Sequence, residues 1–369
     1  MPNSNRSLSA RLRALSSSFS WRTRSTLFAL TSTLAMSAAP PALAVSQPTA
    51  SHGRALGLLS THGARVGSGR SIEFNYPGRS ASSGAKSSGK TGRTPGTTAV
   101  NPLTYHGGSV FSSPYRIYDI YWVPPGYGVA AGYQSTVDGF VQNVAADSGK
   151  STNVFYSDTQ YADSAGNHVP YSVSFGGSAT ATDAFPASGC SDSAVPAGPC
   201  LSDTQAASEI QRVAAAHGWT VGYPNIFVIL MPKDVGNCAS YSSGGLEGYC
   251  SFTNTCAWHH QWGGLFFAVQ PYVGNRSGCQ TGQSPSGSYD ADQTINTMSH
   301  ELNESVTDPS GGSWYDVNGY ENGDKCSWNF ATALGGTSGR LYNQVINGAG
   351  YYVQQEWSNQ SSKCLLTGT

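Results

Sequence analysis

The chain has 369 residues and a formal net charge of −1, but its two parts differ in charge. Residues 1–100 hold 12 of the 20 Lys and Arg side chains and one acid, Glu73, whereas residues 101–369 hold 8 basic and 20 acidic side chains, a net charge of −12. A region this acidic repels nucleic acid and anionic lipid. We therefore expect no nucleic-acid partner, and a cation is the favoured charged ligand.

The first 44 residues have the pattern of a secretory signal peptide. Five arginines and no acid precede an apolar stretch at 25–39, and the segment ends in Ala42-Leu43-Ala44. This order predicts cleavage near Ala44. The apolar stretch is shorter than the roughly 18–20 residues that a membrane helix needs. We therefore expect a secreted, extracellular protein with no membrane attachment after cleavage.

Residues 45–100 are rich in Ser, Gly, Arg and Thr and poor in large apolar side chains. Such a segment cannot bury enough surface to offset the entropy of ordering it, which predicts a disordered linker or pro-segment. A plain spacer is favoured over an inhibitory propeptide. The globular domain is expected over residues 101–369.

From Asn101 onwards, apolar residues recur with the spacing of strands and helices. The continuous apolar run at 225–231 is typical of a strand buried on both faces, and a Ser-Asp N-cap begins the helical pattern at 202–217. Strands alternating with helices predict a single α/β domain (α+β is the alternative) with a central mixed sheet flanked by helices. The predicted strands are at 115–123, 168–175, 225–231, 265–269 and near 351–357, and the helices are at 134–145, 202–217 and 292–306.

The eight cysteines all follow the predicted cleavage site. An even number in an exported chain predicts four disulfides, and the absence of any Cys-x-x-Cys pair disfavours a zinc-thiolate site. The favoured local pairs are Cys190–Cys200 and Cys326–Cys364. The remaining two bonds are shared, in an order left open, by Cys238, Cys250, Cys256 and Cys279.

The strongest chemical signal is His-Glu-Leu-Asn-Glu at residues 300–304. His300 and Glu304 are four residues apart, so on a helix they lie on one face and can bind one metal ion. Glu301 occupies the position at which metallohydrolases keep the carboxylate that accepts a proton from water. Glu304 replaces the usual second histidine, so the site suits Zn²⁺ but also admits Ca²⁺ or Mn²⁺.

The same helix fits a plainer interpretation. Its apolar residues recur on the side opposite His300 and Glu304, as in a surface helix whose polar face is in water. These residues are Ile295, Met298, Leu302 and Val306.

Acidic and histidine residues elsewhere favour the metal site. Glu321 and Asp324 follow Glu304 by 17 and 20 residues, a separation at which zinc hydrolases often supply a third ligand. Upstream, His259 and His260 follow Cys256 in a segment that is either structural or contributes one ligand. A further interpretation is sugar binding by four tryptophans, which are Trp258, Trp262, Trp314 and Trp357.

The order of motifs resembles the EXORDIUM/phosphate-induced protein family of secreted plant proteins and their bacterial relatives. The resemblance extends over most of residues 105–366, through His106-Gly-Gly-Ser-Val-Phe, Ile226-Phe-Val-Ile-Leu-Met-Pro-Lys-Asp, Cys256-Ala-Trp-His, and Ser299-His-Glu-Leu-Asn-Glu-Ser-Val-Thr-Asp-Pro. It implies an extracellular or wall-associated protein with no settled catalytic mechanism. The family's Cys-x-aromatic-His element matches at His259 and favours it over His260. The long Ser/Arg-rich leader and the Cys190-to-Cys200 loop depart from the family.

These observations support three functions. The first is a secreted metal-dependent hydrolase, most plausibly peptidase-like, with Glu301 as base and with His300, Glu304, His259, Glu321 and Asp324 as metal ligands or their orienting partners. The second is a non-catalytic extracellular or cell-wall-associated binding protein with a structural cation site. The third is a polysaccharide binder or hydrolase. The expected partner is accordingly an extracellular protein, a peptide or a cell-wall polymer.

Overall fold

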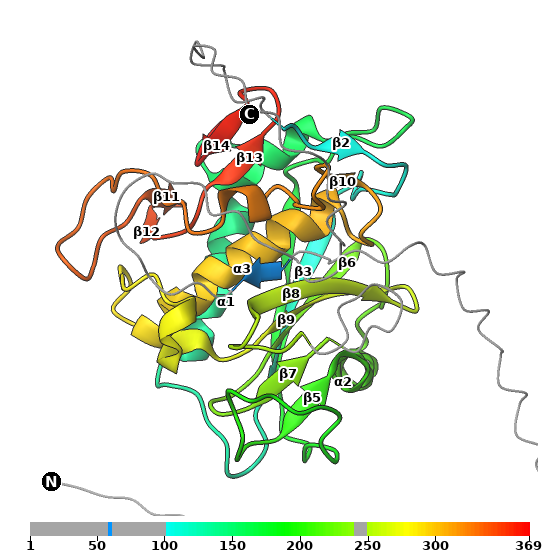
Figure 1. Ribbon diagram of the computed structural model, residues 1–369, viewed down its shortest axis with the longest axis vertical. Coiled ribbons are helices and arrows are strands. Elements are labelled where there is room, and N and C mark those ends of the chain that lie inside the picture. The colour runs from blue at the N-terminus through cyan, green and yellow to red at the C-terminus, as the bar shows by residue number, and fades with distance from the viewer. Residues whose placement is uncertain (1–57, 61–100, 240–248) are drawn as a thin grey trace, which may run out of the picture. The chain divides into compact units, whose positions relative to one another are not determined.

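A mixed β-sheet forms the centre of the computed structural model, which describes residues 58–60, 101–239 and 249–369 (Figure 1). The predicted signal peptide at 1–44 lies outside the described residues. So does nearly all of the predicted linker at 45–100, of which the backbone of β1 (Leu58–Ser60) is described. The described residues belong to one unit, Gln47–Thr369.

The sheet has the strand order β1-β8-β9-β6-β3-β4. Strands β4, β3, β6 and β9 are parallel to one another, whereas β8 is antiparallel to β9 and β1 is antiparallel to β8. This confirms the mixed sheet. The bounds of the longer strands are β3 Tyr115–Trp122, β4 Val173–Ala181, β6 Asn225–Leu230, β8 Thr255–Trp262 and β9 Leu265–Gln270.

Helices cover both faces of this sheet, and the central strand β6 shows how. Ile226 and Val228 pack into a core with α1 (Tyr133–Ala146) and α3 (Tyr289–Thr307). Phe227 and Ile229, between and beyond them, pack into a second core with α2 (Asp203–His217). Because successive side chains of a strand point to opposite faces, a continuous apolar run serves two cores, as the sequence predicts.

Helix α2 begins and ends where its sequence predicts. The Ser202 hydroxyl accepts a hydrogen bond from the Gln205 backbone N–H, and the Gln205 side chain accepts one from the Ser202 backbone N–H. This capping box satisfies two N–H groups that the first helical turn leaves without partners. Gly218 ends the helix with a φ of 67°, a conformation that favours glycine.

Two predicted elements need correction, and one strand was missed. The strand predicted at 168–175 is wrong for its first five residues, because β4 begins at Val173 and continues through small residues to Ala181. Helix α3 begins at Tyr289, three residues before its predicted start. Strand β8 was not predicted, because its two histidines interrupt the apolar signal.

Short paired strands and 3₁₀ helices surround the main sheet. The strand pairs are β2 Thr104–Tyr105 with β10 Trp314–Tyr315, β5 Cys200–Ser202 with β7 Gly236–Cys238, β11 Gln344–Ile346 with β12 Ala349–Tyr351, and β13 Glu356–Ser358 with β14 Lys363–Leu365. The 3₁₀ helices are η1 Val154–Gln160, η2 Val273–Asn275, η3 Ser277–Cys279 and η4 Asp324–Cys326. Strand β13 contacts η1, and η1 also contacts α3, the helix that carries most of the candidate site.

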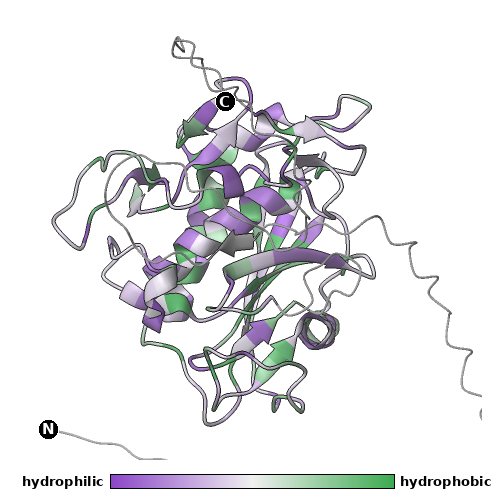
Figure 2. Ribbon diagram, in the orientation of Figure 1, coloured by the Kyte–Doolittle hydropathy of each residue, from purple (hydrophilic) through white to green (hydrophobic). Residues whose placement is uncertain are grey.

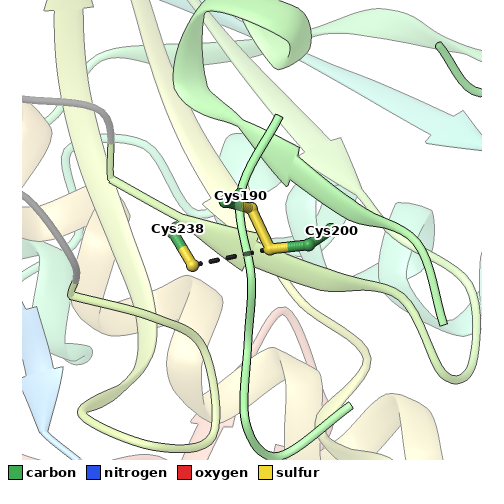
Figure 3. A group of neighbouring side chains, drawn as sticks. All are labelled: Cys190, Cys200 and Cys238. Atoms are coloured by element: carbon green, nitrogen blue, oxygen red, sulfur yellow. Dashed lines mark hydrogen bonds between the residues drawn. A yellow bond between two sulfur atoms is a disulfide. The ribbon is translucent and has the colours of Figure 1, made fainter. Parts of the chain in front are cut away.

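All eight cysteines form disulfides, as predicted. The Cys190–Cys200 and Cys326–Cys364 bonds are confirmed, and the order left open resolves into Cys238–Cys250 and Cys256–Cys279. The Cys190–Cys200 and Cys238–Cys250 disulfides lie in contact, with Cys200 Sγ 3.5 Å from Cys238 Sγ (Figure 3).

Among residues 58–60, 101–239 and 249–369, no helix has both the length and the apolar character needed to span a membrane.

Candidate metal centre

Helix α3 is buried around its whole circumference from Ala291 onwards, although about two thirds of its side chains are polar. Every residue from Ala291 to Thr307 is buried, and hydrophilic and hydrophobic residues are interleaved along the helix (Figure 2). His300, Glu301 and Glu304 are each 0% exposed. The surface-helix interpretation is therefore wrong, because the tail of the chain covers the face that was expected to meet water.

Strand β8 supplies the histidine that completes the site. Trp258 and His260 point to the α2 side of the sheet, where Trp258 donates to Asp203 and the His260 ring lies against Phe267. His259, between them, points to the opposite side and meets α3. This placement agrees with the preference for His259 over His260 and follows from strand alternation.

The protonation of His259 is set by a backbone carbonyl. Its Nε2 lies 3.2 Å from the Asp308 carbonyl oxygen, which can only accept, so Nε2 carries the proton. Its Nδ1 therefore presents a lone pair, 3.4 Å from Glu301 Oε2 and 3.6 Å from Glu304 Oε2. Two acceptors facing each other require a proton or a cation between them. Histidine ligands of metals are commonly oriented in this way, by a carbonyl on the other ring nitrogen.

His300 meets the same carboxylate from within the helix. Its Nε2 is 3.1 Å from Glu304 Oε2 and 3.7 Å from Asp324 Oδ1. Its Nδ1 lies 2.7 Å from Gln354 Nε2, which also donates to the Gly323 carbonyl at 2.9 Å. In this arrangement Nε2 holds the proton. Metal binding at Nε2 requires the other tautomer, which a 180° turn of the Gln354 amide supplies in exchange for the bond to Gly323.

The segment before and within η4 closes the site from the side of the chain's tail. The Asp324 backbone N–H donates to Glu304 Oε1 at 2.9 Å, and Glu321 Oε2 lies 3.7 Å from His259 Nε2. Gly323 permits this approach, since a Cβ there would lie 2.7 Å from His300 Nδ1. The Cys326–Cys364 bond attaches the segment to β14. All six predicted residues are thus brought together.

The group forms two overlapping sets of ligand atoms that share Glu304. One set is His259, Glu301 and Glu304, and the other is His300, Glu304 and Asp324; within each set all ligand atoms lie within 4.8 Å of one another. An ion with bonds of about 2.0–2.1 Å holds tetrahedral ligand atoms about 3.3–3.4 Å apart. The separations of 3.1, 3.4 and 3.6 Å around Glu304 Oε2 and His259 Nδ1 fit that spacing.

Burial opposes charge on His259, His300, Glu304 and Asp324. It lowers the pKa of His259 and of His300 to about 4, so both rings are neutral at physiological pH. It raises the pKa of Glu304 and of Asp324 well above the usual carboxyl range. These carboxyl groups therefore hold protons that a divalent cation would replace.

Two further buried acids surround Glu304 and were not predicted. Burial and the nearby Glu304 charge raise the pKa of Asp158, in η1, and of Glu356, in β13, well above the usual range. Asp158 Oδ1 also accepts a hydrogen bond from the Asn322 side chain at 3.1 Å. Each is a lone acid in an otherwise unremarkable stretch, so no spacing in the sequence marks it.

The four tryptophans considered for sugar binding differ in exposure. Trp258 is 2% exposed, and Trp314 and Trp357 are partly buried against other side chains. Trp262 is exposed at 40%. The cysteine trio Cys190, Cys200 and Cys238 also brings potential ligand atoms close together, but their sulfur atoms are consumed in disulfides and offer no thiolate.

Comparisons with models of protein families, with curated proteins and with solved structures find no match for this chain.

Proposed function

We propose that this protein is a secreted, metal-dependent hydrolase of peptidase-like type, with Zn²⁺ as the favoured ion and Mn²⁺ or Ca²⁺ as alternatives. One observation above all supports this. The Asp308 carbonyl fixes the proton of His259 on Nε2, so that its Nδ1 lone pair faces the carboxylates of Glu301 and Glu304 at 3.4 and 3.6 Å. A cation resolves that acceptor–acceptor contact.

The residues divide into holding and proton-transfer roles. His259, His300, Glu304 and Asp324, which come from the two ligand sets that share Glu304, would hold the ion. Glu321 lies beside the Nε2 edge of His259, where it helps to orient the ring. A zinc ion at such a site lowers the pKa of its water and polarises a substrate carbonyl. Glu301, which lies between the two histidines at 3.4 and 3.9 Å, is placed to accept the proton.

An extracellular peptide or protein is the proposed substrate, with a cell-wall polymer as the broader class. Four disulfides support an oxidising environment. The net charge of −12 over residues 101–369 disfavours nucleic acid. The resemblance of residues 105–366 to the EXORDIUM/phosphate-induced family supports the same extracellular placement and adds no mechanism.

A second candidate is an extracellular binding protein in which the cation is purely structural. The observation that favours it is the enclosure of the site, since His259, His300, Glu301 and Glu304 are each at most 1% exposed. Structural zinc sites are typically saturated by protein ligands, whereas catalytic sites keep a position for water. Turnover separates the two candidates, because both predict bound metal.

The experiment is elemental analysis of the secreted protein, purified without chelator, beside His259→Ala, His300→Ala and the control His260→Ala. His260 is a buried histidine on the same strand that points away from α3. We expect about one zinc per chain in the parent and the control, and much less in the two other variants, because loss of one ligand weakens metal binding by at least about tenfold. Equal metal content in all four proteins would refute the site. Calcium in place of zinc would favour the structural candidate.

A further inference from the structure

Strand β1 pairs with the strand that carries His259. The register places Leu58 opposite Trp258, Leu59 opposite Ala257 and Ser60 opposite Thr255, in antiparallel orientation. His259 directly follows the paired residue Trp258. A segment from before the globular domain therefore forms the edge of the sheet immediately beside the candidate metal centre.

The same short strand also contacts α3, which carries His300, Glu301 and Glu304. In Figure 1 it is the blue arrow between α3 and β8. Strand β1 therefore lies against both elements that supply most of the candidate ligands, β8 and α3.

Resting on the hydrolase function proposed above, we propose that the outer edge of β8 binds the extended backbone of a peptide substrate, and that Leu58–Ser60 occupies this edge as an autoinhibitory strand. An edge strand offers a row of backbone donors and acceptors, which pair with any extended peptide irrespective of its side chains. β1 uses three positions of a strand that continues to Trp262.

Charge and covalent attachment both favour the segment over a free peptide. Residues 47–100 contain seven basic side chains and one acid, Glu73, against a net charge of −12 over residues 101–369. Opposite charges draw the two together. Because β1 belongs to the same chain, its pairing is intramolecular, and a free peptide competes poorly against it. Cleavage within 61–100 would make the pairing bimolecular and release the edge.

The sequence between β1 and the globular domain contains basic residues at which a protease can cleave. Six Lys or Arg residues lie between β1 and the domain, at Arg65, Arg70, Arg79, Lys86, Lys90 and Arg93. Lys and Arg are the residues after which secreted proteases specific for basic side chains cut. The proposal thus assigns residues 45–100 a role as an inhibitory pro-segment rather than a plain spacer.

The test uses the full secreted chain with a recognition site for a sequence-specific protease inserted between Gly84 and Ala85. The folded protein is cleaved, the released fragment is removed by gel filtration, and a fluorescent peptide of residues 54–64 is titrated in an anisotropy assay. The control peptide carries Leu58→Pro and Leu59→Pro, which removes the N–H that pairs with β8. We expect the parent peptide to bind the cleaved protein at least about tenfold more tightly than the control peptide, and the uncleaved protein not at all.

Hydrolysis of a mixed library of fluorogenic peptides provides the second readout. Cleaved protein and the uncleaved variant Leu58→Pro/Leu59→Pro should turn over substrate at least about tenfold faster than the uncleaved parent. The matched control Ala81→Pro/Ser82→Pro changes the same segment outside β1 and should stay at the parent rate. Equal, measurable rates in all forms, or equal binding of the two peptides, would overturn the autoinhibitory strand.

The two proposals fail differently. If no form hydrolyses any substrate but the 54–64 peptide binds only after cleavage, the peptide-binding edge stands and the hydrolase function falls. If hydrolysis is metal-dependent but unaffected by cleavage or by the β1 prolines, the hydrolase stands and the inhibitory role of β1 is refuted.

Discussion

Helices α2 and α3 pack on opposite faces of one sheet, and they are held there by different kinds of side chain. α2 buries Ala206, Ile210, Val213 and their apolar neighbours on one stripe and leaves the opposite stripe in water. α3 is buried on every side, and its buried side chains include His300, Glu301 and Glu304. Burial stabilises the first arrangement and penalises the second, unless the charges are matched.

The two sides of the sheet differ in whether they need protons or an ion from solution. The apolar side chains of α2 are buried by other side chains of the same protein, so this helix needs no bound ion. The carboxyl groups around α3 outnumber the basic groups near them, since both histidines are neutral there. Protons can satisfy this face at low pH, and a cation can satisfy it at neutral pH. The face of the sheet covered by α3 should therefore respond to metal and pH, and the face covered by α2 should not.

The sharpest test of that contrast is Glu301→Gln. We expect peptide hydrolysis to fall by about 10²–10⁴-fold, the usual contribution of a positioned base, while metal content is retained through the other ligands. Initial rates and elemental analysis on the same preparation check this. Loss of metal together with activity would instead make Glu301 a ligand. A fully active variant would break the proposed mechanism.

Removal of the Cys326–Cys364 bond by serine substitution should destabilise the protein by about 4 kcal/mol, because it closes a loop of 38 residues. It should also weaken metal binding, since η4 holds Asp324. The matched control replaces Cys190 and Cys200, which lie beside α2. That loop of 10 residues predicts a smaller loss, about 3 kcal/mol, and no change in metal affinity. Denaturant unfolding and zinc titration measure both quantities.

Gly323→Ala tests the close approach of η4 to α3. The added Cβ would lie 2.7 Å from His300 Nδ1 and 2.9 Å from Glu304 Oε1, so the segment must shift. We expect a loss of about 1–3 kcal/mol in the free energy of unfolding, together with weaker metal binding. Gly139→Ala, in α1 with no atom within 4 Å of its Cβ, should instead stabilise by about 0.5–1 kcal/mol. Equal effects at both positions would show that the close approach of Gly323 to His300 and Glu304 does not limit the side chain at this position.

Chelation should expose the pH dependence of the α3 side. The buried carboxyl groups have raised pKa values, so the native state holds protons that the unfolded chain releases, and stability is lost as pH rises. The lowered pKa values of the histidines act oppositely, but only below about 6.5. From pH 6.5 to 8, the metal-free protein should therefore lose about 1.4 kcal/mol per pH unit for each proton released. Thermal unfolding with chelator, compared with saturating zinc, measures this; a flat profile in chelator would contradict it.

Ser202→Ala has the smallest expected effect and concerns the other face. It removes one half of the capping box of α2 and should cost about 1 kcal/mol of stability. Metal affinity should not change. A change in metal content in this variant would show that the two faces of the sheet are coupled, which would contradict the expectation that only the α3 face responds to metal.

The same contrast explains what the sequence could predict. The cap and apolar stripe of α2, the apolar run of β6 and the disulfides depend on neighbouring residues, and local patterns encode them. The HExxE spacing likewise brings His300 and Glu304 together within one helix. The burial of their face depends on η1, η4 and β13, which lie far away in the chain. Asp158 and Glu356 have no local signal, because their importance comes only from their nearness to Glu304.

The two disulfides in contact near α2 have a consequence for how the protein is made. Cys190, Cys200, Cys238 and Cys250 lie in one neighbourhood, where Cys200 Sγ and Cys238 Sγ are 3.5 Å apart (Figure 3). Four such thiols can be oxidised in three ways, and nearness alone does not select the native one. Rapid air oxidation should therefore trap isomers, whereas a glutathione redox buffer or an isomerase lets them exchange. Peptide mapping of the Cys190–Cys200 link is the check that a recombinant preparation is correctly folded.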